Sequence, residues 1–343
     1  MGLDYRTVLW NKHKKTYDKW IAIGVLIYLL CFIGITVGVN PEITAETIII
    51  RAFGTLAIAL LHIILAIGPL ARLNPSFLPL LYNRRHLGVS MFLAALVHGV
   101  FSIIQFHTLG NTNPIHALFT SNMDYGSLIN FPFQVLGFFA LIILFLMAAT
   151  SHDFWLKNLS PKTWKRLHMM VYFAYALVLL HVFLGALQQQ PSPWSIGILS
   201  LGFIGIASLH LATGIKETKV DRQKTGMVKE GWEYVCDINE IPEDRAKIFV
   251  VNKERIAIFK YNGKLSAISN VCKHQGGPLG EGKVVDGCVT CPWHGYQYLP
   301  HNGQSPPPFT EKIATYRLKK VGHEIYVDPV GLAEGTPIEP VTF

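Results

Sequence analysis

The sequence is poor in charged residues. Asp, Glu, Lys and Arg make up only 15% of its 343 residues, whereas 50% of the residues are hydrophobic. Soluble proteins carry about 25% charged residues, so this composition excludes an ordinary soluble protein. The deficit lies in residues 20–214, which hold long apolar runs, whereas residues 215–343 have ordinary polar content. The sequence therefore predicts a membrane part followed by a small soluble part.

Cysteine and several catalytic patterns are also scarce. The five cysteines are too scattered for a disulfide framework. They are Cys31, Cys236, Cys272, Cys288 and Cys291. No glycine-rich nucleotide-binding loop, Ser/His/Asp arrangement or carboxylate pair stands out. The net charge of +8 lies mainly beside apolar runs, which is typical of membrane helices and argues against nucleic acid as a partner.

Six apolar segments approach or exceed the roughly 20 residues that a membrane-crossing helix needs. They are residues 20–39, 48–70, 86–107, 131–150, 167–187 and 194–214. Lys and Arg occur in the flanking segments 1–19, 71–85 and 151–166. Neither occurs in the alternate loops 40–47, 108–130 and 188–193. Because positively charged loops stay in the cytoplasm, we expect a multi-pass protein of the bacterial inner (cytoplasmic) membrane with both chain ends in the cytoplasm.

The soluble part has the pattern of a small β domain. The stretch "RIAIFKYNGKLSAIS", residues 255–269, alternates apolar and polar residues around Asn262–Gly263, and both turn residues tolerate the positive φ of a type I′ turn. Residues 247–251 and 315–327 add further strands. We therefore expect a membrane α-helical bundle of six transmembrane helices plus a small all-β domain. The expected parts are a cytoplasmic segment 1–19, the bundle 20–214, a linker 215–228, the β domain 229–330 and a tail 331–343.

Histidines occur within the apolar segments, where an imidazole is costly unless it faces the bundle interior and has a partner. Four lie inside spans and two at span ends: His62, His98, His168, His181, and His86 and His210. Helical bundles commonly hold haem between histidines of facing helices. At 1.5 Å per residue, His98 and His181 lie about 18 and 20 Å from the cytoplasmic ends of their spans. His98 and His181 therefore lie at nearly the same depth in the membrane, as two axial ligands of one haem must.

A second haem is a weaker expectation. His168 lies about 20 Å nearer the cytoplasm than His181, and thirteen residues of an ideal helix place the two on different faces. A second haem would need a bent helix or an offset position. Its other ligand would be His62, His86 or His210. Three arginines near span ends could pair with haem propionates or serve as interfacial anchors: Arg51, Arg84 and Arg85.

Two stretches of the membrane part resemble a known family. "RRHLGVSMFLAALVHGV" (84–100) and "KTWKRLHMMVYFAYALVLLH" (162–181) are similar to the ferric reductase-like transmembrane domain. The likeness is greatest to the haem-binding membrane subunit of the bacterial periplasmic methionine sulfoxide reductase system. The resemblance implies b-type haem, electron passage across the membrane, and haem ligands at His98, His168 and His181. Members of that subfamily can also bind FMN, which no segment here supports independently.

The soluble part contains two short motifs, each with one cysteine and one histidine. They are Cys272-x-His274 and, after sixteen intervening residues, Cys291-x-x-His294. Two thiolates with two imidazoles can bind structural zinc. One cysteine and one histidine on each loop also suit a two-iron cluster in which two cysteines bind one iron and two histidines the other.

The flanking residues distinguish these possibilities. "CKHQGGPL", "CPWHGYQY" and "PPPF" (306–309) resemble the Rieske [2Fe–2S] domain over residues 230–328. The resemblance implies that Cys272 and Cys291 hold the inner iron, and His274 and His294 the outer one. Gly277 and Trp293 stand where respiratory Rieske proteins have a disulfide. Tyr296 stands where they place a serine hydroxyl, so we expect a comparatively low reduction potential.

Both expected centres carry one electron at a time, which predicts a transmembrane electron-transfer protein. The expected partners are a cytoplasmic reductase or ferredoxin and a periplasmic redox acceptor, with either direction of flow. The centres would be the Rieske [2Fe–2S] cluster and one haem b, or two. Two alternatives stay open: a quinol-linked membrane oxidoreductase, and a Rieske-based redox sensor.

Overall fold

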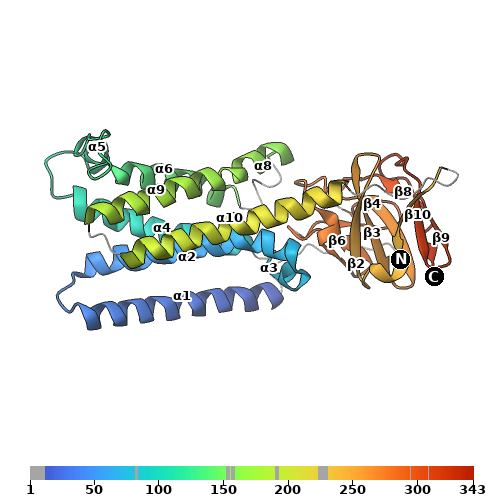
Figure 1. Ribbon diagram of the computed structural model, residues 1–343, viewed down its shortest axis with the longest axis horizontal. Coiled ribbons are helices and arrows are strands. Elements are labelled where there is room, and N and C mark those ends of the chain that lie inside the picture. Colours follow the sequence, from blue (N-terminus) through green and yellow to red (C-terminus); the bar gives the residue numbers. More distant parts are fainter. Residues whose placement is uncertain are drawn as a thin grey trace. The chain divides into compact units, whose positions relative to one another are not determined.

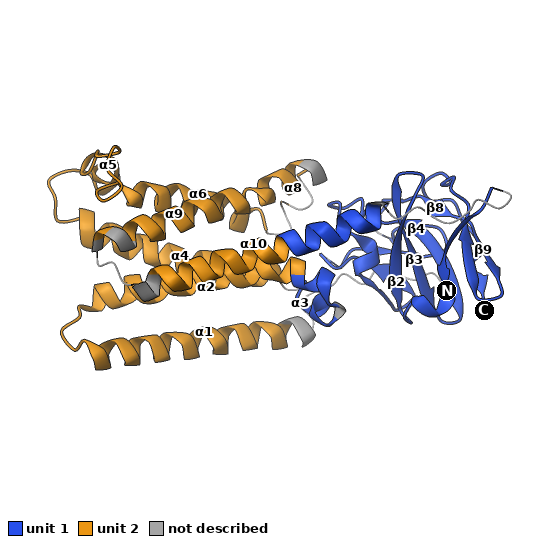
Figure 2. Cartoon of the chain, viewed as in Figure 1, with its two compact units in different colours: residues 1–11, 70–82, 211–343 blue, residues 12–69, 83–210 orange. Residues whose placement is uncertain are grey.

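The computed structural model describes most of the chain in two compact units (Figure 2). The described residues are 12–81, 84–151, 155, 159–189, 193–222, 231–293, 295–307 and 309–343. The helical unit falls within residues 12–69 and 83–210. The second unit combines residues of 70–82 with residues of 211–343. The expected domain boundaries therefore stay a prediction.

The helical unit is built from long apolar helices (Figure 1). Its elements are α1 (Lys12–Val39), α2 (Ala45–Leu73), α4 (Arg84–His107), α5 (Pro114–Thr120), α6 (Phe133–Ala149), α8 (Pro161–Met169), α9 (Val171–Gln189) and α10 (Pro193–Arg222). The last residues of α2 and of α10 belong to the second unit. Within the described ranges, five helical segments are long and apolar enough to cross a membrane. They are Lys15–Val39, Ala45–Leu73, Arg84–His107, Thr163–Gly185 and Ile196–Asp221.

The sixth expected span is shorter than predicted. Residues 131–150 contain α6, an apolar helix of 17 residues, which is about 26 Å long. The hydrocarbon core of a bilayer is about 30 Å thick. Pro132 precedes the helix, and Thr150 ends it by donating its N–H to Leu146 O (3.0 Å). The described residues therefore hold five helices long enough to cross a membrane and one shorter apolar helix, so the expected number of six spans is not met in full.

The expected span 167–187 is interrupted. A turn at Met170 separates α8 from α9, and the Met170 N–H donates to the Leu167 carbonyl (3.1 Å). His168 consequently lies in α8 and His181 in α9. A second haem near His168 therefore stays a prediction.

The ends of several elements differ from the expectation. α10 continues to Arg222, so residues 215–222 of the expected linker are helical. The expected polar loop 108–130 contains the short helix α5, which begins after Asn113 because that side chain accepts the N–H groups of Ile115 and His116. The second unit also holds the one-turn helix α3 (Leu78–Leu81).

The β domain consists of three small antiparallel sheets, with strand orders β1-β10-β9, β11-β4-β3-β2 and β5-β6-β7, and β8 paired with β4 (Figure 1). The strands are β1 (Glu233–Asp237), β2 (Arg245–Val251), β3 (Glu254–Tyr261), β4 (Lys264–Ser269), β5 (Lys283–Val285), β6 (Cys288–Thr290), β7 (Gln297–Tyr298), β8 (Thr315–Tyr316), β9 (Leu318–Val321), β10 (Glu324–Val327) and β11 (Val341–Thr342). This confirms the expected all-β domain.

The predicted hairpin at Asn262–Gly263 is confirmed. Tyr261 pairs with Lys264 across a two-residue turn, and the φ angles of Asn262 and Gly263 are +46° and +70°. Side chains on the two faces of the resulting β3–β4 ribbon enter different cores, because successive residues of a strand point to opposite sides. Ile256 and Ile258 enter one core. Ala257 and Phe259 enter the other core, which also contains Cys272 and Cys291.

Candidate functional site

The loop that follows β4 begins at Cys272 and closes on itself. The Cys272 N–H donates to the Gly277 carbonyl (2.9 Å), and the Gly276 N–H donates back to the Cys272 carbonyl (2.7 Å). Gly276 has a φ of +71°, a left-handed conformation that glycine adopts without steric cost. The tight turn therefore holds a buried cysteine at its base.

The loop that follows β6 repeats this backbone pattern. The Cys291 N–H donates to the Tyr296 carbonyl (2.8 Å), and the Gly295 N–H donates back to the Cys291 carbonyl (2.9 Å). Gly295 has a φ of +73°. Besides the cysteine itself, the two turns share only the glycine four residues later. A repeated Cys-x-x-x-Gly spacing was thus a readable signal for paired turns, and it was not used in the sequence prediction.

The two cysteines lie together beneath a tyrosine. The Cys272 sulfur is hydrogen-bonded with Cys291 and lies 3.5 Å from the Tyr298 hydroxyl. That hydroxyl accepts the Lys273 N–H (2.9 Å), which leaves its own proton available to the sulfur. Tyr298 was missing from the sequence candidates. Its partner is 26 positions away, so only pairing of β7 beside the loop brings them together.

The protonation of this group follows from its surroundings. Burial raises the pKa of the Cys272 thiol. Hydrogen bonds with Cys291 and Tyr298 and from the backbone N–H groups of His274 and Gln275 act against burial, and the pKa ends below its usual value. Burial and the neighbouring Cys272 raise the pKa of Tyr298. Tyr298 therefore keeps its proton while the adjacent sulfur is favoured as a thiolate.

His274 presents one ring nitrogen to the interior. Its Nδ1 atom is buried, although the residue as a whole is half-buried. The ring stacks on Tyr296 with centroids 4.9 Å apart and planes 7° from parallel. Within the described residues no three His, Cys, Asp or Glu side chains converge as a metal site. His294, the fourth expected ligand, lies outside the described residues.

Gly277 and Tyr296 belong to the two cysteine turns, and both are constrained by neighbouring side chains. A Cβ atom at Gly277 would lie 2.8 Å from the Cys291 sulfur and 3.2 Å from the Trp293 ring, so the position admits no side chain without displacing neighbours. The Tyr296 hydroxyl donates to Glu311 and is thereby directed to a carboxylate. The comparatively low reduction potential expected from the sequence stays a prediction.

The donor set suits an iron–sulfur cluster. Two adjacent cysteines, an imidazole with an inward nitrogen and backbone N–H groups aimed at sulfur provide ligands and positive dipoles for a negatively charged group. A Cβ atom at Gly277 would lie only 2.8 Å from the Cys291 sulfur, so the glycine permits the close packing of the two cysteine turns. The residues present therefore fit a [2Fe–2S] cluster.

In the helical unit, His98 and His181 occupy equivalent settings. Nδ1 of His98 in α4 is 2.9 Å from the Ile50 carbonyl of α2. Nδ1 of His181 in α9 is 2.9 Å from the Phe133 carbonyl of α6. A carbonyl can only accept, so each Nδ1 carries the proton and each Nε2 keeps a lone pair for a metal. The two ring centroids are 6.0 Å apart.

A glycine makes room for each of these rings. A Cβ atom at Gly54 would lie 2.7 Å from Nδ1 of His98, and one at Gly137 would lie 2.7 Å from Nδ1 of His181. Each glycine stands four residues after the carbonyl that holds the ring, namely one helical turn. These glycines were missed in the sequence prediction because their partners lie on other helices. The pair of oriented imidazoles fits axial ligation of one haem.

The other candidate histidines have different surroundings. Nδ1 of His62 is 2.8 Å from Ile58 O and its Nε2 is 3.1 Å from the Tyr175 hydroxyl, so both ring nitrogens are engaged. Nδ1 of His168 is 3.1 Å from Trp164 O, and its ring stacks on that indole at 3.7 Å. The structure does not bring His62 and His168 together as a hydrogen-bonded or stacked pair among its described contacts.

His86 lies near the start of α4, as expected, whereas His210 lies inside the span Ile196–Asp221 because α10 continues beyond the expected end at residue 214. Nδ1 of His86 is 2.8 Å from Asp18 Oδ1 of α1. Nε2 of His210 is 3.2 Å from the Leu65 carbonyl of α2. Of the three arginines, Arg51 is exposed on α2, and Arg84 and Arg85 are half-buried at the start of α4. Whether any of these residues contacts haem stays a prediction.

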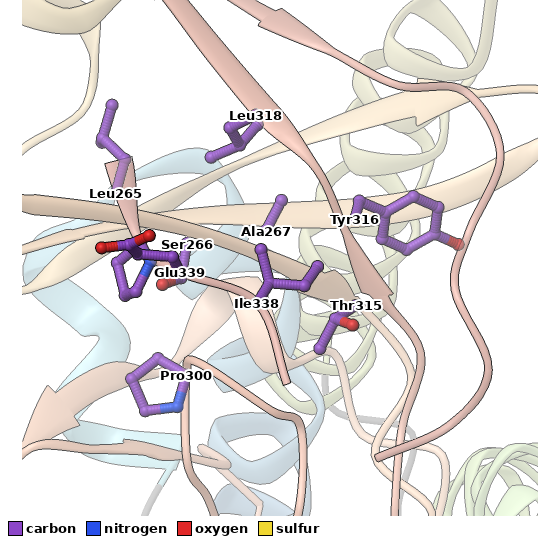
Figure 3. Close-up of a pocket in the computed structure, with 10 residues that line it drawn as sticks. Leu265, Ser266, Ala267, Pro300, Thr315, Tyr316, Leu318, Ile338 and Glu339 are labelled. Carbon is purple, nitrogen blue, oxygen red and sulfur yellow. The ribbon is translucent and has the colours of Figure 1, made fainter. Parts of the chain in front are cut away.

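Two pockets among the described residues differ in what they could hold. One lies between β4, β8 and residues 338–340 of the β domain (Figure 3). Its volume of about 10 Å³ is enough for one water molecule, and it therefore lacks room for a substrate. The other has a volume of about 500 Å³ and lies between α1, α2 and α4, with His86 and Asp18 among its lining residues.

Comparison with known proteins identifies the β domain. Residues 231–317 match the Rieske [2Fe-2S] domain. The anthranilate 1,2-dioxygenase ferredoxin subunit of Burkholderia cepacia is 32% identical over 98 residues, which cover 28% of this chain and 91% of that protein. The chain belongs to the Rieske family. A second relative, the biphenyl dioxygenase ferredoxin subunit of Pseudomonas sp. (strain KKS102), is 30% identical over 27% of this chain and 87% of its own length.

Two further matches differ in the share of their own length that is covered. The cholesterol 7-desaturase nvd 1 of Ciona intestinalis is 28% identical over 107 residues, and the chain spans 23% of it. A solved structure, the ferredoxin of carbazole 1,9a-dioxygenase from Nocardioides aromaticivorans IC177, is 22% identical with a TM-score of 0.27. That match covers 28% of this chain and 96% of the ferredoxin.

The membrane part of this Rieske protein also matches a family. Residues 53–179 match the ferric reductase like transmembrane component. The fusion expected from the sequence, a ferric reductase-like membrane domain followed by a Rieske domain, is thus confirmed. The chain is a multi-pass membrane protein with an electron-transfer function, and its Rieske domain indicates a [2Fe–2S] cofactor.

Proposed function

We propose that this Rieske protein conducts single electrons across the bacterial inner membrane. Its redox centres are a Rieske cluster in the β domain and b-type haem in the helical unit. The partners are a cytoplasmic reductase or ferredoxin and a periplasmic acceptor, and the N-terminus and the Rieske domain are cytoplasmic. The observation that carries the proposal is the equivalent setting of His98 and His181, each oriented by a carbonyl and fitted against a glycine of a neighbouring helix.

In the β domain, Cys272 and Cys291 would hold one iron of the cluster, and His274 and His294 would hold the other. When bound, the cluster supplies a one-electron centre whose potential exceeds that of four-cysteine ferredoxins because two ligands are neutral imidazoles. The chain itself keeps the cysteines buried. Tyr298 holds a proton at its hydroxyl beside the Cys272 sulfur. These residues exclude water from the sulfur atoms and offset part of their negative charge.

In the helical unit, His98 and His181 would hold one haem through their Nε2 atoms. When bound, the haem supplies a second one-electron centre. The carbonyls of Ile50 and Phe133 fix the tautomer and the direction of each ring. A second haem at His168 stays a hypothesis. Arg51, Arg84 and Arg85 stay candidates for propionate contacts, and no observation supports FMN.

The test is an anaerobic redox titration of the purified full chain, followed by visible absorbance and low-temperature EPR. We expect a six-coordinate low-spin b haem and a reduced Rieske signal. His98→Leu or His181→Leu should lose the low-spin haem spectrum and retain the Rieske signal. The control is His107→Leu, because His107 also lies in the helical unit but bonds through Nε2 to Gln134 (2.7 Å). Retention of normal haem in both ligand variants would refute the assignment.

A second candidate function is a quinol-linked membrane oxidoreductase. The cavity of about 500 Å³ favours it, because a mainly apolar space ends at the His86–Asp18 pair. Such a pair can accept a proton from a ring hydroxyl, with Asp18 stabilising the resulting imidazolium. Under this function, an added quinol should reduce the haem, and His86→Gln should slow the reduction at least tenfold. If several quinols fail to reduce the haem, the quinol-linked function is excluded and the electron-conduit function remains.

A further inference from the structure

Gln275 carries an unpaired amide in the interior of the Rieske domain. The residue is 2% exposed. Its Nε2 and Oε1 atoms are both buried and have no hydrogen-bond partner among the residues that the structure describes. An amide that leaves water without finding a partner costs free energy. The position therefore indicates a partner that the described protein residues do not provide.

This feature separates Gln275 from other glutamines. Gln304 of the same domain donates through Nε2 to the Gly335 carbonyl (2.8 Å), and Gln188 of α9 donates to the Phe131 carbonyl (2.6 Å). Gln105 lacks a partner only at Oε1, since its Nε2 donates to Thr47 (3.2 Å). Among the described residues, Gln275 alone has a buried amide with both polar atoms unpaired.

The missing partner is indicated by where the residue lies. Gln275 stands within the first cysteine turn, directly after His274. Its backbone N–H lies close enough to the Cys272 sulfur to help lower the pKa of that thiol. The group expected at these turns contains inorganic sulfide and thiolate, which accept hydrogen bonds and donate none. Only the Nε2–H₂ end of an amide can satisfy such atoms.

We propose that the Gln275 amide donates a hydrogen bond to a sulfur atom of the bound [2Fe–2S] cluster and raises its reduction potential. A reduced cluster carries one more negative charge than an oxidised one, so a donor to its sulfur stabilises the reduced form more. Gln275 is thus a tuning residue rather than an iron ligand. The inference depends on the cluster occupying the two cysteine turns, as proposed above.

The experiment measures the Rieske midpoint potential in the full-length protein by EPR-monitored titration. Gln275→Leu removes the donor and keeps an apolar side chain of similar size. We expect the equilibrium constant for reduction to fall about tenfold, which is a shift of about 59 mV for one electron. Iron and sulfide content should remain at the wild-type level. Gln275→Met is the second variant, because its flexible side chain fills the same space without a donor.

The control is Gln304→Leu, which removes a paired amide of the same domain. It should lower the stability of the domain and leave the potential unchanged. An unchanged potential in Gln275→Leu or Gln275→Met with full cluster content would overturn the inference and leave the electron-conduit proposal intact. A wild-type protein without any Rieske signal would instead contradict the proposed ligand set.

Direct spectroscopic evidence keeps the inference testable if both variants fail to assemble a cluster. Pulsed EPR on the reduced wild-type protein, with ¹⁵N-labelled glutamine side chains, should detect a weak nitrogen coupling and an exchangeable proton. The same coupling should persist in Gln297→Leu, which removes the other buried glutamine near the second turn. A reduced cluster with no glutamine coupling would overturn the inference.

Discussion

At the scale of single residues, hydrogen bonds to sulfur decide how easily the cluster takes an electron. The sequence predicted a comparatively low potential, because Gly277 and Tyr296 replace a disulfide and a serine-like donor. The structure adds a donor that works in the opposite direction, since the Tyr298 hydroxyl lies 3.5 Å from the Cys272 sulfur. The low potential therefore stays a prediction, with Tyr298 limiting how low it falls.

The effect of Tyr298 can be measured with Tyr298→Phe. The change removes one neutral donor from the sulfur, so the equilibrium constant for cluster reduction should fall up to about tenfold, or about 59 mV. EPR-monitored titration provides the value. Tyr316→Phe is the control, since the Tyr316 hydroxyl is also in the β domain but donates to Glu254 (2.6 Å). Equal potentials in both variants would contradict a role for the Tyr298 hydroxyl.

At the scale of elements, close contacts between helices orient the membrane histidines. His98 and His181 each require a carbonyl and a glycine from a neighbouring helix. Apolar helices attract one another without a preferred rotation in lipid, so small residues at the contact set how closely they approach. The glycines at these contacts thus contribute to the haem site without offering any ligand atom.

Gly54→Ala or Gly137→Ala should therefore disturb haem binding. The new Cβ atom would lie 2.7 Å from Nδ1 of the facing histidine, so the ring must rotate or the helix must shift. We expect less haem per protein and a partly high-spin absorbance spectrum. Gly99→Ala is a demanding control, because its Cβ would meet the flexible Leu141 side chain at 2.8 Å. Loss of haem in the control alone would contradict the explanation.

The two cysteine turns allow a similar test in the β domain. Gly276→Ala and Gly295→Ala place a side chain at φ angles of +71° and +73°, a strain of roughly 1–2 kcal/mol. We expect a lower melting temperature and faster cluster loss. Gly322→Ala introduces comparable strain at φ +60° in the β9–β10 turn. It should destabilise the domain without accelerating cluster loss, unless strain anywhere in the domain releases the cluster.

At the scale of the whole molecule, a conduit must carry electrons from one side of a membrane to the other. In right-side-out vesicles, an impermeant oxidant added outside should oxidise the pre-reduced Rieske cluster of the wild-type protein. His98→Leu should slow this oxidation at least a hundredfold, while leaving the cluster intact by EPR. Rapid oxidation that is independent of His98 would indicate that the Rieske domain lies on the outer side.

The sequence by itself determined the features that depend on local pattern. Hydropathy and loop charge identified a multi-pass membrane part, and the Cys-x-His and Cys-x-x-His motifs identified the Rieske domain. The Asn262–Gly263 turn was also predictable, since two adjacent residues with positive φ define a two-residue hairpin. Each of these signals lies within a short stretch of chain.

Only the tertiary structure decided which distant groups meet. Tyr298 reaches Cys272 across 26 positions, and the carbonyls that orient His98 and His181 are each 48 positions away. Helix lengths also depended on caps and turns, as the short α6 and the break at Met170 show. Hydrogen-bond partners of buried groups are set by packing between elements, and no local periodicity encodes that packing.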